Sequence, residues 1–219
     1  MAEGLGDAIA YLRGADPVLA RLLDEQGPPE LTRDASIPAP GDRYAALVRA
    51  IAGQQLSVLA ARSIYRRLLE YFGGHPPSPE EVLAADPDEM RVAAGLSHAK
   101  TRSLRSLAEH VVSGELELDS LDALDDDEVM ADLVAVKGIG AWSAHMFLMF
   151  QLGRPDVLAV GDLGIRRAVE RAYGLDALPT PAELTALAEP WRPYRTMACR
   201  ILWHWSGNTP VQRPGAAPA

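Results

Sequence analysis

Residues 133–147, with the sequence LVAVKGIGAWSAHMF, place a short turn containing two glycines between two apolar runs. Gly138 and Gly140 allow the backbone to come close to a ligand, and a helix that begins directly after them presents unpaired N–H groups and its positive dipole end. Such a turn is suited to an anion. Three interpretations follow: a loop for a nucleotide cofactor, a plain connection between two helices, or a turn that holds another phosphate.

The pattern of apolar residues favours helices on both sides of this turn, and no convincing strand alternation or internal repeat is present. Helical spacing runs through residues 16–26, 43–74, 78–114, 125–136, 141–153, 161–175 and 181–207. A dinucleotide-binding loop needs a preceding strand and a third glycine, and the third position here is Ser143. The sequence therefore predicts an all-α fold and excludes the cofactor loop.

Local signals mark where several helices begin and end. Asp16 is expected to cap the first helix, with Pro17 at its first position, and Gly95 is expected to end a later one. Residues 27–42 are a proline-rich connector, and residues 207–219 are predicted to form a disordered tail.

Composition excludes several classes of site. The chain has 219 residues and a single cysteine, Cys199, which rules out an internal disulfide framework, a four-cysteine zinc site and an iron–sulfur cluster. Its first residues have neither a basic leader nor a long apolar core, and no apolar run approaches the roughly 18 residues of a membrane span. We therefore expect a cytoplasmic protein that does not contact a membrane.

The charge distribution does not decide whether the partner is a nucleic acid. The formal net charge of −9 argues against non-specific binding to nucleic acid. Nine acidic and no basic residues lie within 115–132, a stretch expected to be a solvated approach to a helix. Basic residues cluster elsewhere, and each cluster alone is best explained as a solvated helix face: Arg62, Arg66 and Arg67; Lys100, Arg102 and Arg105; Arg166, Arg167 and Arg171; Arg192, Arg195 and Arg200.

Four segments together resemble one family. LVAVKGIGAWSA, at 133–144, resembles the helix–hairpin–helix (HhH-GPD) motif of the DNA glycosylase superfamily, and AVGDLGIRRAV, at 159–169, is similar to the segment that carries its catalytic aspartate. LVRAIAGQQLS, at 47–57, is similar to the helix start that meets DNA. WRPYRTMACRILWHW, at 191–205, looks like the last helix of the alkylation-repair branch. The order and spacing of the four motifs indicate this superfamily, and the branch that the chain most resembles is the AlkA-type 3-methyladenine DNA glycosylase II group.

The resemblance implies that Asp162 is the catalytic carboxylate. Cleavage of an N-glycosidic bond builds oxocarbenium-like positive charge on the sugar, which a fixed anion stabilises. An alternative role as a helix N-cap is compatible with this one, because both need a carboxylate at a helix start.

The resemblance also implies that the enzyme does not cut the DNA strand. Trp142 stands where the strand-cleaving branch, resembling endonuclease III, has a lysine that forms a Schiff base with the sugar. A tryptophan cannot form that bond, so we expect a monofunctional glycosylase without AP-lyase activity. Plain core packing is the alternative role for Trp142.

The family pattern assigns further residues to a base pocket, a DNA-binding surface and a cation site. The pocket set is Trp142, Tyr194, Met146 and Leu163. Met146 and Leu163 stand where the usual pattern has aromatic residues. Trp191 is expected to be structural, and Trp203, His204 and Trp205 to be core and surface neighbours on a helix. The DNA-binding set is Gln54, Gln55, Leu56, Ser57, Lys137, Gly138, Ile139, Gly140 and Ala141.

Within the DNA-binding set, Gln55 or Leu56 is expected to fill the gap that a flipped base leaves, although Gln54 and Gln55 also suit capping or turn roles. Lys137 replaces a usual proline and would add a phosphate contact. The backbone carbonyls of Val134, Val136 and Ile139 match a structural Na⁺ or K⁺ site, and no cofactor is required for catalysis.

The expected organisation is two helical subdomains around a cleft. Residues 36–150 form a central helical-barrel subdomain that ends in the hairpin, and residues 1–35 with 151–206 form the second, which carries Asp162. The stretch before the first DNA-binding helix is too short for the N-terminal β domain of longer AlkA-type proteins. The protein is expected to be a monomer that binds double-stranded DNA containing damaged bases. Two alternatives stay open: a glycosylase for ethenoadenine, hypoxanthine, 1-methyladenine or 3-methylcytosine, and a non-catalytic DNA-binding module.

Overall fold

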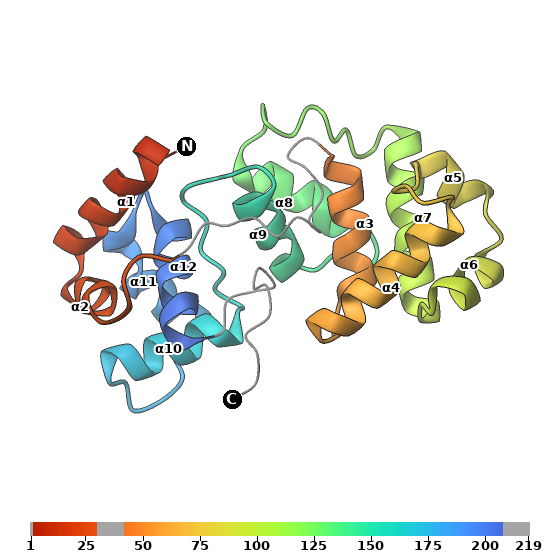
Figure 1. Cartoon of the computed structure of the whole chain (residues 1–219). Coiled ribbons are helices and arrows are strands. Elements are labelled where there is room, and N and C mark those ends of the chain that lie inside the picture. The colour runs from red at the N-terminus through yellow and green to blue at the C-terminus, as the bar shows by residue number, and fades with distance from the viewer. Residues whose placement is uncertain (1, 30–41, 208–219) are drawn as a thin grey trace. The chain divides into compact units, whose positions relative to one another are not determined.

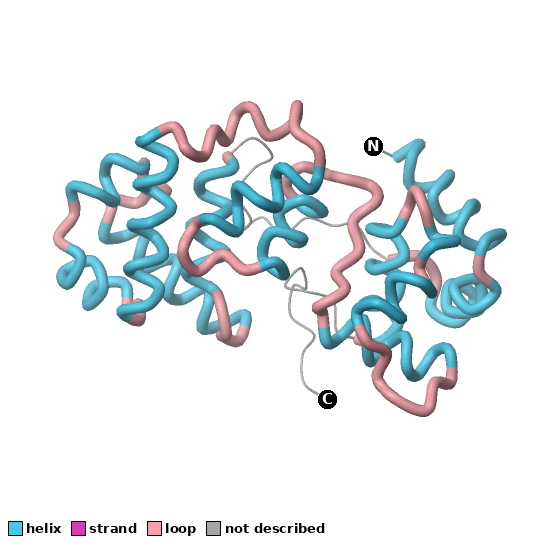
Figure 2. The backbone as a smooth tube through the Cα atoms, turned by 180° about the vertical axis from the view of Figure 1, so that it is seen from behind, coloured by secondary structure: helices cyan, strands magenta, loops and turns pink. Residues whose placement is uncertain are grey.

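The computed structural model describes residues 2–29 and 42–207, and within these ranges it contains only helices and loops (Figures 1 and 2). The helices are α1 (Ala2–Ala15), α2 (Pro17–Gln26), α3 (Arg43–Gly53), α4 (Val58–Tyr71), α5 (Pro79–Ala84), α6 (Pro87–Ala94), α7 (His98–Ser113), α8 (Asp126–Ala135), α9 (Ala141–Phe150), α10 (Leu163–Tyr173), α11 (Pro181–Leu187), the 3₁₀ helix η1 (Glu189–Trp191) and α12 (Arg195–Ser206). The predicted all-α fold is confirmed. No helix of the described ranges combines the length and apolar character that crossing a membrane requires.

The chain divides into two compact units. Unit 1 comprises residues 1–34 and 153–219, and unit 2 comprises residues 35–152. The cleft expected between two subdomains stays a prediction. Apart from residues at their edges, the proline-rich connector and the C-terminal tail lie outside the described residues.

Side-chain caps fix where the helices begin. Asp16 accepts hydrogen bonds from the first turn of α2 and Pro17 occupies its first position, as predicted. Capping boxes start α5, α8 and α11; in α8, Asp125 and Glu128 each bind the backbone N–H of the other. Much of the acidic stretch is thus explained, because carboxylates in a first helical turn complement the helix dipole.

Unit 2 is built around α7. Helices α3 and α5 pack on α7, α4 packs on α3 and α6, and α8 packs on α9. Leu104, Leu107 and Ala108 of α7 are fully buried in this core. Gly95 adopts the left-handed conformation that ends α6, as predicted.

Several basic residues predicted to lie on solvated helix faces instead bind the ends of neighbouring helices. Arg67 Nε donates to the Ala94 carbonyl at 3.0 Å, and Lys100 Nζ donates to the Ala52 carbonyl at 2.8 Å. Arg105 donates to carbonyls at the end of α5. A cation at a helix C-terminus satisfies orphan carbonyls and the negative dipole end. The sequence pattern could not show these bonds, because the partners lie on other helices.

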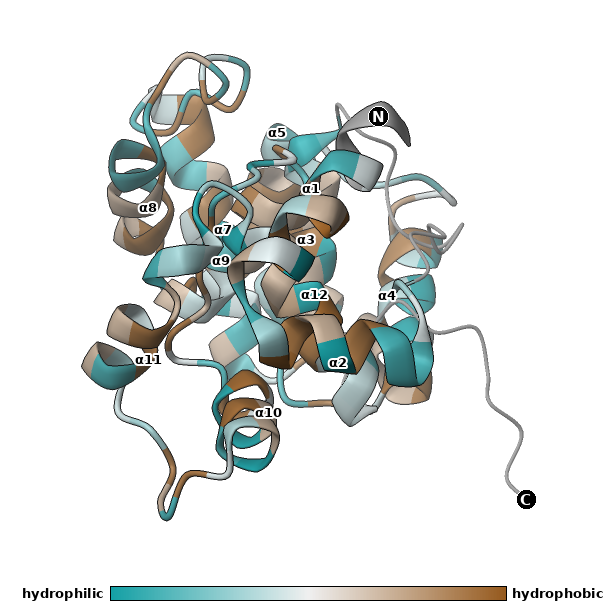
Figure 3. Cartoon of the chain, turned by 90° about the vertical axis from the view of Figure 1, so that its left-hand side faces the viewer, coloured by the Kyte–Doolittle hydropathy of each residue, from teal (hydrophilic) through white to brown (hydrophobic). Residues whose placement is uncertain are grey.

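Unit 1 packs α12 against α2 and α10, with α1 covering α2. Helix α10 buries Ile165, Ala168, Val169 and Ala172, which recur at the spacing of one helix face. Figure 3 shows hydrophobic and hydrophilic residues on α2 and α10 alike, as expected for helices with one side on the core.

Helix α1 was not expected from the sequence. Its segment contains Gly4, Gly6 and Gly14, and glycine is a poor helix former. Packing compensates, because Leu12 is fully buried and α1 contacts α2, η1 and α12. Tertiary contacts therefore outweigh local propensity in this helix.

A buried carboxylate joins three elements of unit 1. Asp16 Oδ1 accepts the N–H groups of Val18 and Leu19, while Oδ2 accepts Tyr173 Oη at 2.5 Å and Trp191 Nε1 at 2.7 Å. Burial, together with the bond to Asp16, raises the pKa of Tyr173. Trp191 is fully buried, which confirms its expected structural role.

Replacing Asp16 by alanine leaves these four donors without their acceptor. We expect Asp16→Ala to lower the free energy of unfolding of unit 1 by about 2–4 kcal/mol, through the lost cap and the unpaired donors. Urea unfolding followed by tryptophan fluorescence measures it. Asp24→Ala is the control, because the ion pair that Asp24 forms with Arg13 is exposed and its loss should change stability by less than about 0.5 kcal/mol. Equal effects of the two substitutions would contradict the role of Asp16.

Candidate functional site

The predicted hairpin is present in unit 2 as two helices joined by a tight turn. Helix α8 ends at Ala135, and α9 begins at Ala141 with Gly140 as its N-cap. The turn is closed by a hydrogen bond from the N–H of Ile139 to the carbonyl of Val136 at 3.0 Å. No side chain of the described residues caps α9. Since Gly140 and Ala141 are exposed, the first N–H groups of α9 are accessible to an anion.

The fold constrains the two glycine positions of the turn differently. Gly138 has a φ of +91°, and a Cβ there would lie 2.0 Å from Ser103 Oγ of α7. At Gly140 φ is −95°, and among the described residues only its own chain neighbours could lie within 4 Å of an added Cβ. The fold therefore requires glycine at 138 but not at 140. A small residue at 140 instead leaves room for a ligand to approach the backbone.

Neighbouring elements hold the turn in place. Gln54 Nε2, at the end of α3, donates to the carbonyl of Gly138 at 2.8 Å. The N–H of Lys137 donates to Ser106 Oγ of α7 at 3.2 Å, while the Lys137 side chain is exposed. Gln54 thus braces the hairpin through its amide nitrogen. A contact of Gln54 or Lys137 with DNA stays a prediction.

The turn between α3 and α4 presents side chains to solvent from a strained backbone. Gln55 has a φ of +58°, and no other non-glycine residue of the described ranges has a positive φ. Gln55, Leu56 and Ser57 are exposed, and Ser57 Oγ caps α4 by accepting the N–H of Ala60 at 3.3 Å. Leu59, which the sequence did not single out, is 78% exposed. Strain of this kind is frequent at functional sites.

The end of α3 beside this turn is reinforced by Lys100. Its ammonium group reaches the Ala52 carbonyl, and burial lowers the pKa of Lys100. One end of the strained turn is thereby fixed to α7.

Trp142 and Met146 lie one turn apart on α9. Trp142 is 44% exposed, whereas Phe147 and Leu148 on the same helix are buried. Core packing, the alternative role for Trp142, therefore accounts for only part of its surface. Met146 is half-buried. The predicted roles of Trp142 and Met146 in a base pocket stay predictions.

Asp162 of unit 1 is buried at the start of α10 and is 8% exposed. Its Oδ1 accepts the N–H of Ile165 at 2.8 Å, which confirms the N-cap role. The same oxygen accepts Trp203 Nε1 of α12 at 3.1 Å. Trp203 is a core residue, as predicted, but its bond to Asp162 was missed, because 41 residues separate the two partners. No local sequence signal points to it.

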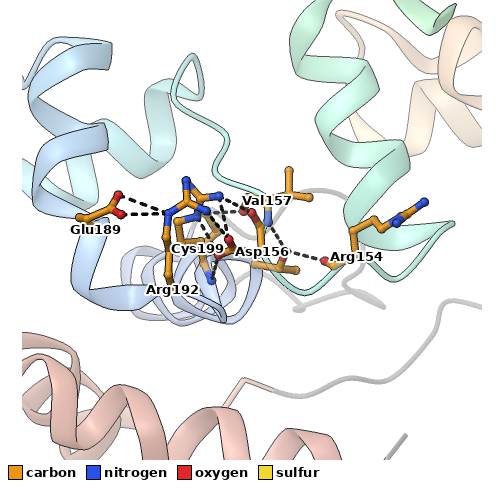
Figure 4. A network of polar contacts seen from close by, with 8 residues as sticks. Arg154, Asp156, Val157, Glu189, Arg192 and Cys199 are labelled. Carbon is orange, nitrogen blue, oxygen red and sulfur yellow. Dashed lines mark hydrogen bonds and ion pairs between the residues drawn. The ribbon is translucent and has the colours of Figure 1, made fainter. Parts of the chain in front are cut away.

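The segment that leads to Asp162 is clamped to the start of α12 (Figure 4). Asp156 Oδ1 accepts Arg195 Nε at 2.7 Å and Asp156 Oδ2 accepts Arg192 Nη1 at 2.7 Å. Arg195 Nη2 also donates to the carbonyl of Asp156 at 2.8 Å. Arg192 pairs with Glu189 of η1 as well, at 3.2 Å. Arg192 and Arg195 thus serve the fold of unit 1.

Thr196 provides a second layer of this clamp. Its N–H donates to the carbonyl of Pro155 at 3.0 Å, and its hydroxyl donates to that of Arg154 at 2.7 Å while accepting the N–H of Val157 at 3.0 Å. The neighbouring thiol of Cys199 lies 3.9 Å from the Val157 carbonyl, and burial raises its pKa to about 12. Cys199 is therefore a packing residue.

The two other predicted pocket residues of unit 1 lie near solvent. Leu163 follows Asp162 directly and is 47% exposed. Tyr194 is half-buried, and its ring packs edge-on against Tyr11 of α1 with centroids 5.4 Å apart. Tyr11 was missed because α1 itself was not expected. It adds an aromatic ring beside the predicted pocket residue Tyr194.

The predicted site residues fall into two groups that the fold brings together separately. Unit 1 contains Asp162, Leu163 and Tyr194, and it adds Trp203, which was predicted only as a helix neighbour, as a partner of Asp162. Unit 2 gathers the hairpin and the α3–α4 turn through Gln54. The union of both groups in one active site stays a prediction.

The described residues contain no group of three or more His, Cys, Asp or Glu side chains that could hold a metal ion. The predicted monovalent-cation site uses backbone carbonyls instead. The Val136 carbonyl accepts one N–H bond in the turn and keeps a second lone pair, and Val134 lies in the last turn of α8, where carbonyls lack helical partners. The backbone carbonyl oxygens of Val134, Val136 and Ile139 are therefore ligands of the kind that suits a hard cation.

Comparisons with known proteins agree on one family. A model described as HhH-GPD superfamily base excision DNA repair protein matches residues 48–193. DNA-3-methyladenine glycosylase 1 of Schizosaccharomyces pombe is 34% identical over 212 residues, which are 96% of this chain and 91% of that protein. The motifs quoted above thus lie in a chain that matches such proteins along nearly its whole length.

Solved structures give the same result. The structure of 3-methyladenine DNA glycosylase from Schizosaccharomyces pombe in complex with abasic DNA has a TM-score of 0.79 and 32% identity, covering 95% of this chain and 100% of that one. DNA-3-methyladenine glycosidase from Bacillus halodurans has a TM-score of 0.78 and 34% identity, covering 91% and 89%.

The two glycines of the hairpin can be tested separately. We expect Gly138→Ala to destabilise unit 2 by at least about 2 kcal/mol, because the substitution forces a positive φ and a clash with Ser103. Gly140→Ala should change stability by less than about 0.5 kcal/mol, since its backbone and surroundings accept a methyl group. Thermal unfolding followed by circular dichroism measures both. Equal stability of the two variants would show that the turn is not built as described.

Proposed function

Because the chain belongs to the HhH-GPD superfamily of base excision DNA repair proteins, we propose that it is a monofunctional DNA glycosylase. It flips a damaged base out of double-stranded DNA and hydrolyses the N-glycosidic bond, leaving an abasic site. The observation that carries this proposal is the buried carboxylate of Asp162, which lies within the family-matched region and is held at a helix start by the N–H groups of Ile165 and Trp203.

Asp162 acts on the sugar. As the glycosidic bond breaks, positive charge grows on the deoxyribose ring, and a carboxylate fixed beforehand stabilises that charge without reorganising. Asp162 also orients the attacking water in this proposal. A leaving base that already carries positive charge needs no strong acid, so one carboxylate is sufficient.

The proposed substrates are N-alkylated purines, with 3-methyladenine first among them. Such bases are cationic, and the electron-rich face of Trp142 attracts a cation. The names of the relatives, which are 3-methyladenine glycosylases, support this choice. Tyr194 would contribute a second ring, whereas Met146 and Leu163 make the pocket less aromatic than usual. Ethenoadenine, hypoxanthine, 1-methyladenine and 3-methylcytosine are the alternative substrates.

DNA would be held by the hairpin and the α3–α4 turn. The uncapped start of α9 at Gly140 and Ala141 suits a DNA phosphate, and the close backbone approach needs the glycine that the fold itself does not require. Gln55, or Leu56 after it, would fill the space of the flipped base. The strained and exposed conformation of Gln55 supports this role.

A structural Na⁺ or K⁺ at Val134, Val136 and Ile139 would stiffen the hairpin when bound. The chemistry assigned to Asp162 needs no cofactor. We also propose that the protein acts as a monomer.

Base release from methylated DNA tests the function. Duplex DNA treated with dimethyl sulfate is incubated with the purified protein, and the released bases are identified by chromatography. Release of 3-methyladenine is expected. Release only from ethenoadenine- or hypoxanthine-containing duplexes would favour the alternative substrates, and binding without release of any base would favour a non-catalytic DNA-binding module.

Substitution of Asp162 by asparagine should remove catalysis while DNA binding persists. We expect the rate of base release to fall at least about 100-fold, because an amide cannot offset the charge on the sugar. Single-turnover assays and a fluorescence binding titration measure the two effects. Asp24→Asn is the control: it makes the same change from carboxylate to carboxamide at an exposed position of the same unit, and it should leave the rate unchanged. An active Asp162→Asn protein would refute the mechanism.

The absence of AP-lyase activity can be tested by trapping. Incubation with abasic duplex DNA and sodium borohydride should give no covalent protein–DNA adduct, since Trp142 cannot form the Schiff base that borohydride reduces. A lysine-dependent bifunctional glycosylase serves as the positive control on the same DNA. A stable adduct in gel electrophoresis, or strand cleavage without added base, would contradict the proposal.

A further inference from the structure

Two donors from different helices converge on one oxygen of Asp162. The N–H of Ile165 belongs to α10, the helix that Asp162 caps, and Trp203 Nε1 belongs to α12. Trp203 is 1% exposed, so its indole N–H has lost contact with water, and Asp162 supplies an acceptor for it. We propose that Trp203 is a positioning residue for catalysis, which fixes the orientation of the Asp162 carboxylate through this bond. The inference rests on the proposed function of Asp162.

A cap bond alone does not determine the orientation of a side chain. The bond from Ile165 ties Oδ1 to the start of α10, and a single contact of this kind does not by itself prevent rotation of a carboxylate. The bond from Trp203 restricts that rotation, because it approaches from α12, another helix that packs on α10. Electrostatic stabilisation of a transition state depends on such prior orientation.

Helix α12 also fixes the chain before Asp162. Arg195 and Thr196, in its first turn, hold residues 154–157 through the clamp described above. Trp203 lies about two helical turns further along α12. Residues of α12 therefore bind both ends of the segment 154–162, and Trp203 donates a hydrogen bond to the carboxylate itself.

The chain contains a matched pair for comparison. Asp16 caps α2 as Asp162 caps α10, and it accepts an indole N–H from Trp191, which is as buried as Trp203. Asp16 has no catalytic role in the proposed function. Replacing either tryptophan by phenylalanine removes one indole N–H from one buried aspartate, so the two variants differ mainly in which aspartate loses its donor.

The experiment compares Trp203→Phe with Trp191→Phe on dimethyl-sulfate-treated duplex DNA under single-turnover conditions. We expect Trp203→Phe to lower the rate of 3-methyladenine release about 10- to 100-fold, the size of a lost hydrogen bond to a charged group, with DNA affinity unchanged. Trp191→Phe should keep the wild-type rate below its unfolding temperature.

A second measurement tests the inference without Trp203→Phe, in case that variant folds poorly. In ¹⁵N-labelled protein, Asp162→Asn should shift the indole N–H resonance of Trp203 and leave that of Trp191 in place. An unmoved Trp203 resonance, or equal rates for the two phenylalanine variants, would overturn the inference. Failure of the wild-type protein to release any base would instead refute the proposed function, so the two failures are distinguishable.

Discussion

The ion pair between Asp156 and Arg195 anchors the part of unit 1 on which the proposed chemistry depends. A bidentate arginine–carboxylate contact is geometrically demanding, and here it is reinforced by the Asp156 carbonyl and by Arg192. It holds the loop that ends at Asp162 against α12, and this packed helix restricts the motion of the carboxylate. On a loose loop, ordering the carboxylate during the reaction would cost free energy.

Unit 2 reaches a similar result by other means. Its hairpin is held by neutral bonds from Gln54 and Ser106 and by the close contact of Gly138 with α7. These contacts leave the N–H groups at the start of α9 facing outward, uncapped by any side chain. The rigid contacts of the turn thus lie on its inner side, and the groups suited to a phosphate lie on the outer side.

Local chemistry decided which parts of this structure could be predicted. Asp16 before Pro17, the glycines of the hairpin and Asp162 before an amphipathic helix are signals within one turn of chain, and each was read correctly as a cap or a turn. The bond of Trp203 to Asp162 and the carbonyl contacts of Arg67 and Lys100 join residues that only tertiary packing brings together. Helix α1 follows the same rule, since its stability comes from packing rather than from its glycine-containing sequence.

The use of basic residues inside the fold resolves the tension between a net charge of −9 and a DNA substrate. Arg67, Lys100, Arg105 and Arg195 bind carbonyls or carboxylates of the chain itself, so their charges are already offset locally. Affinity for DNA would then come less from a diffuse positive field than from backbone dipoles at the start of α9 and from side chains of the α3–α4 turn. Such contacts would need a closely fitted backbone. The selectivity of an acidic protein of this design would then depend on the fit of two short turns and not on non-specific attraction.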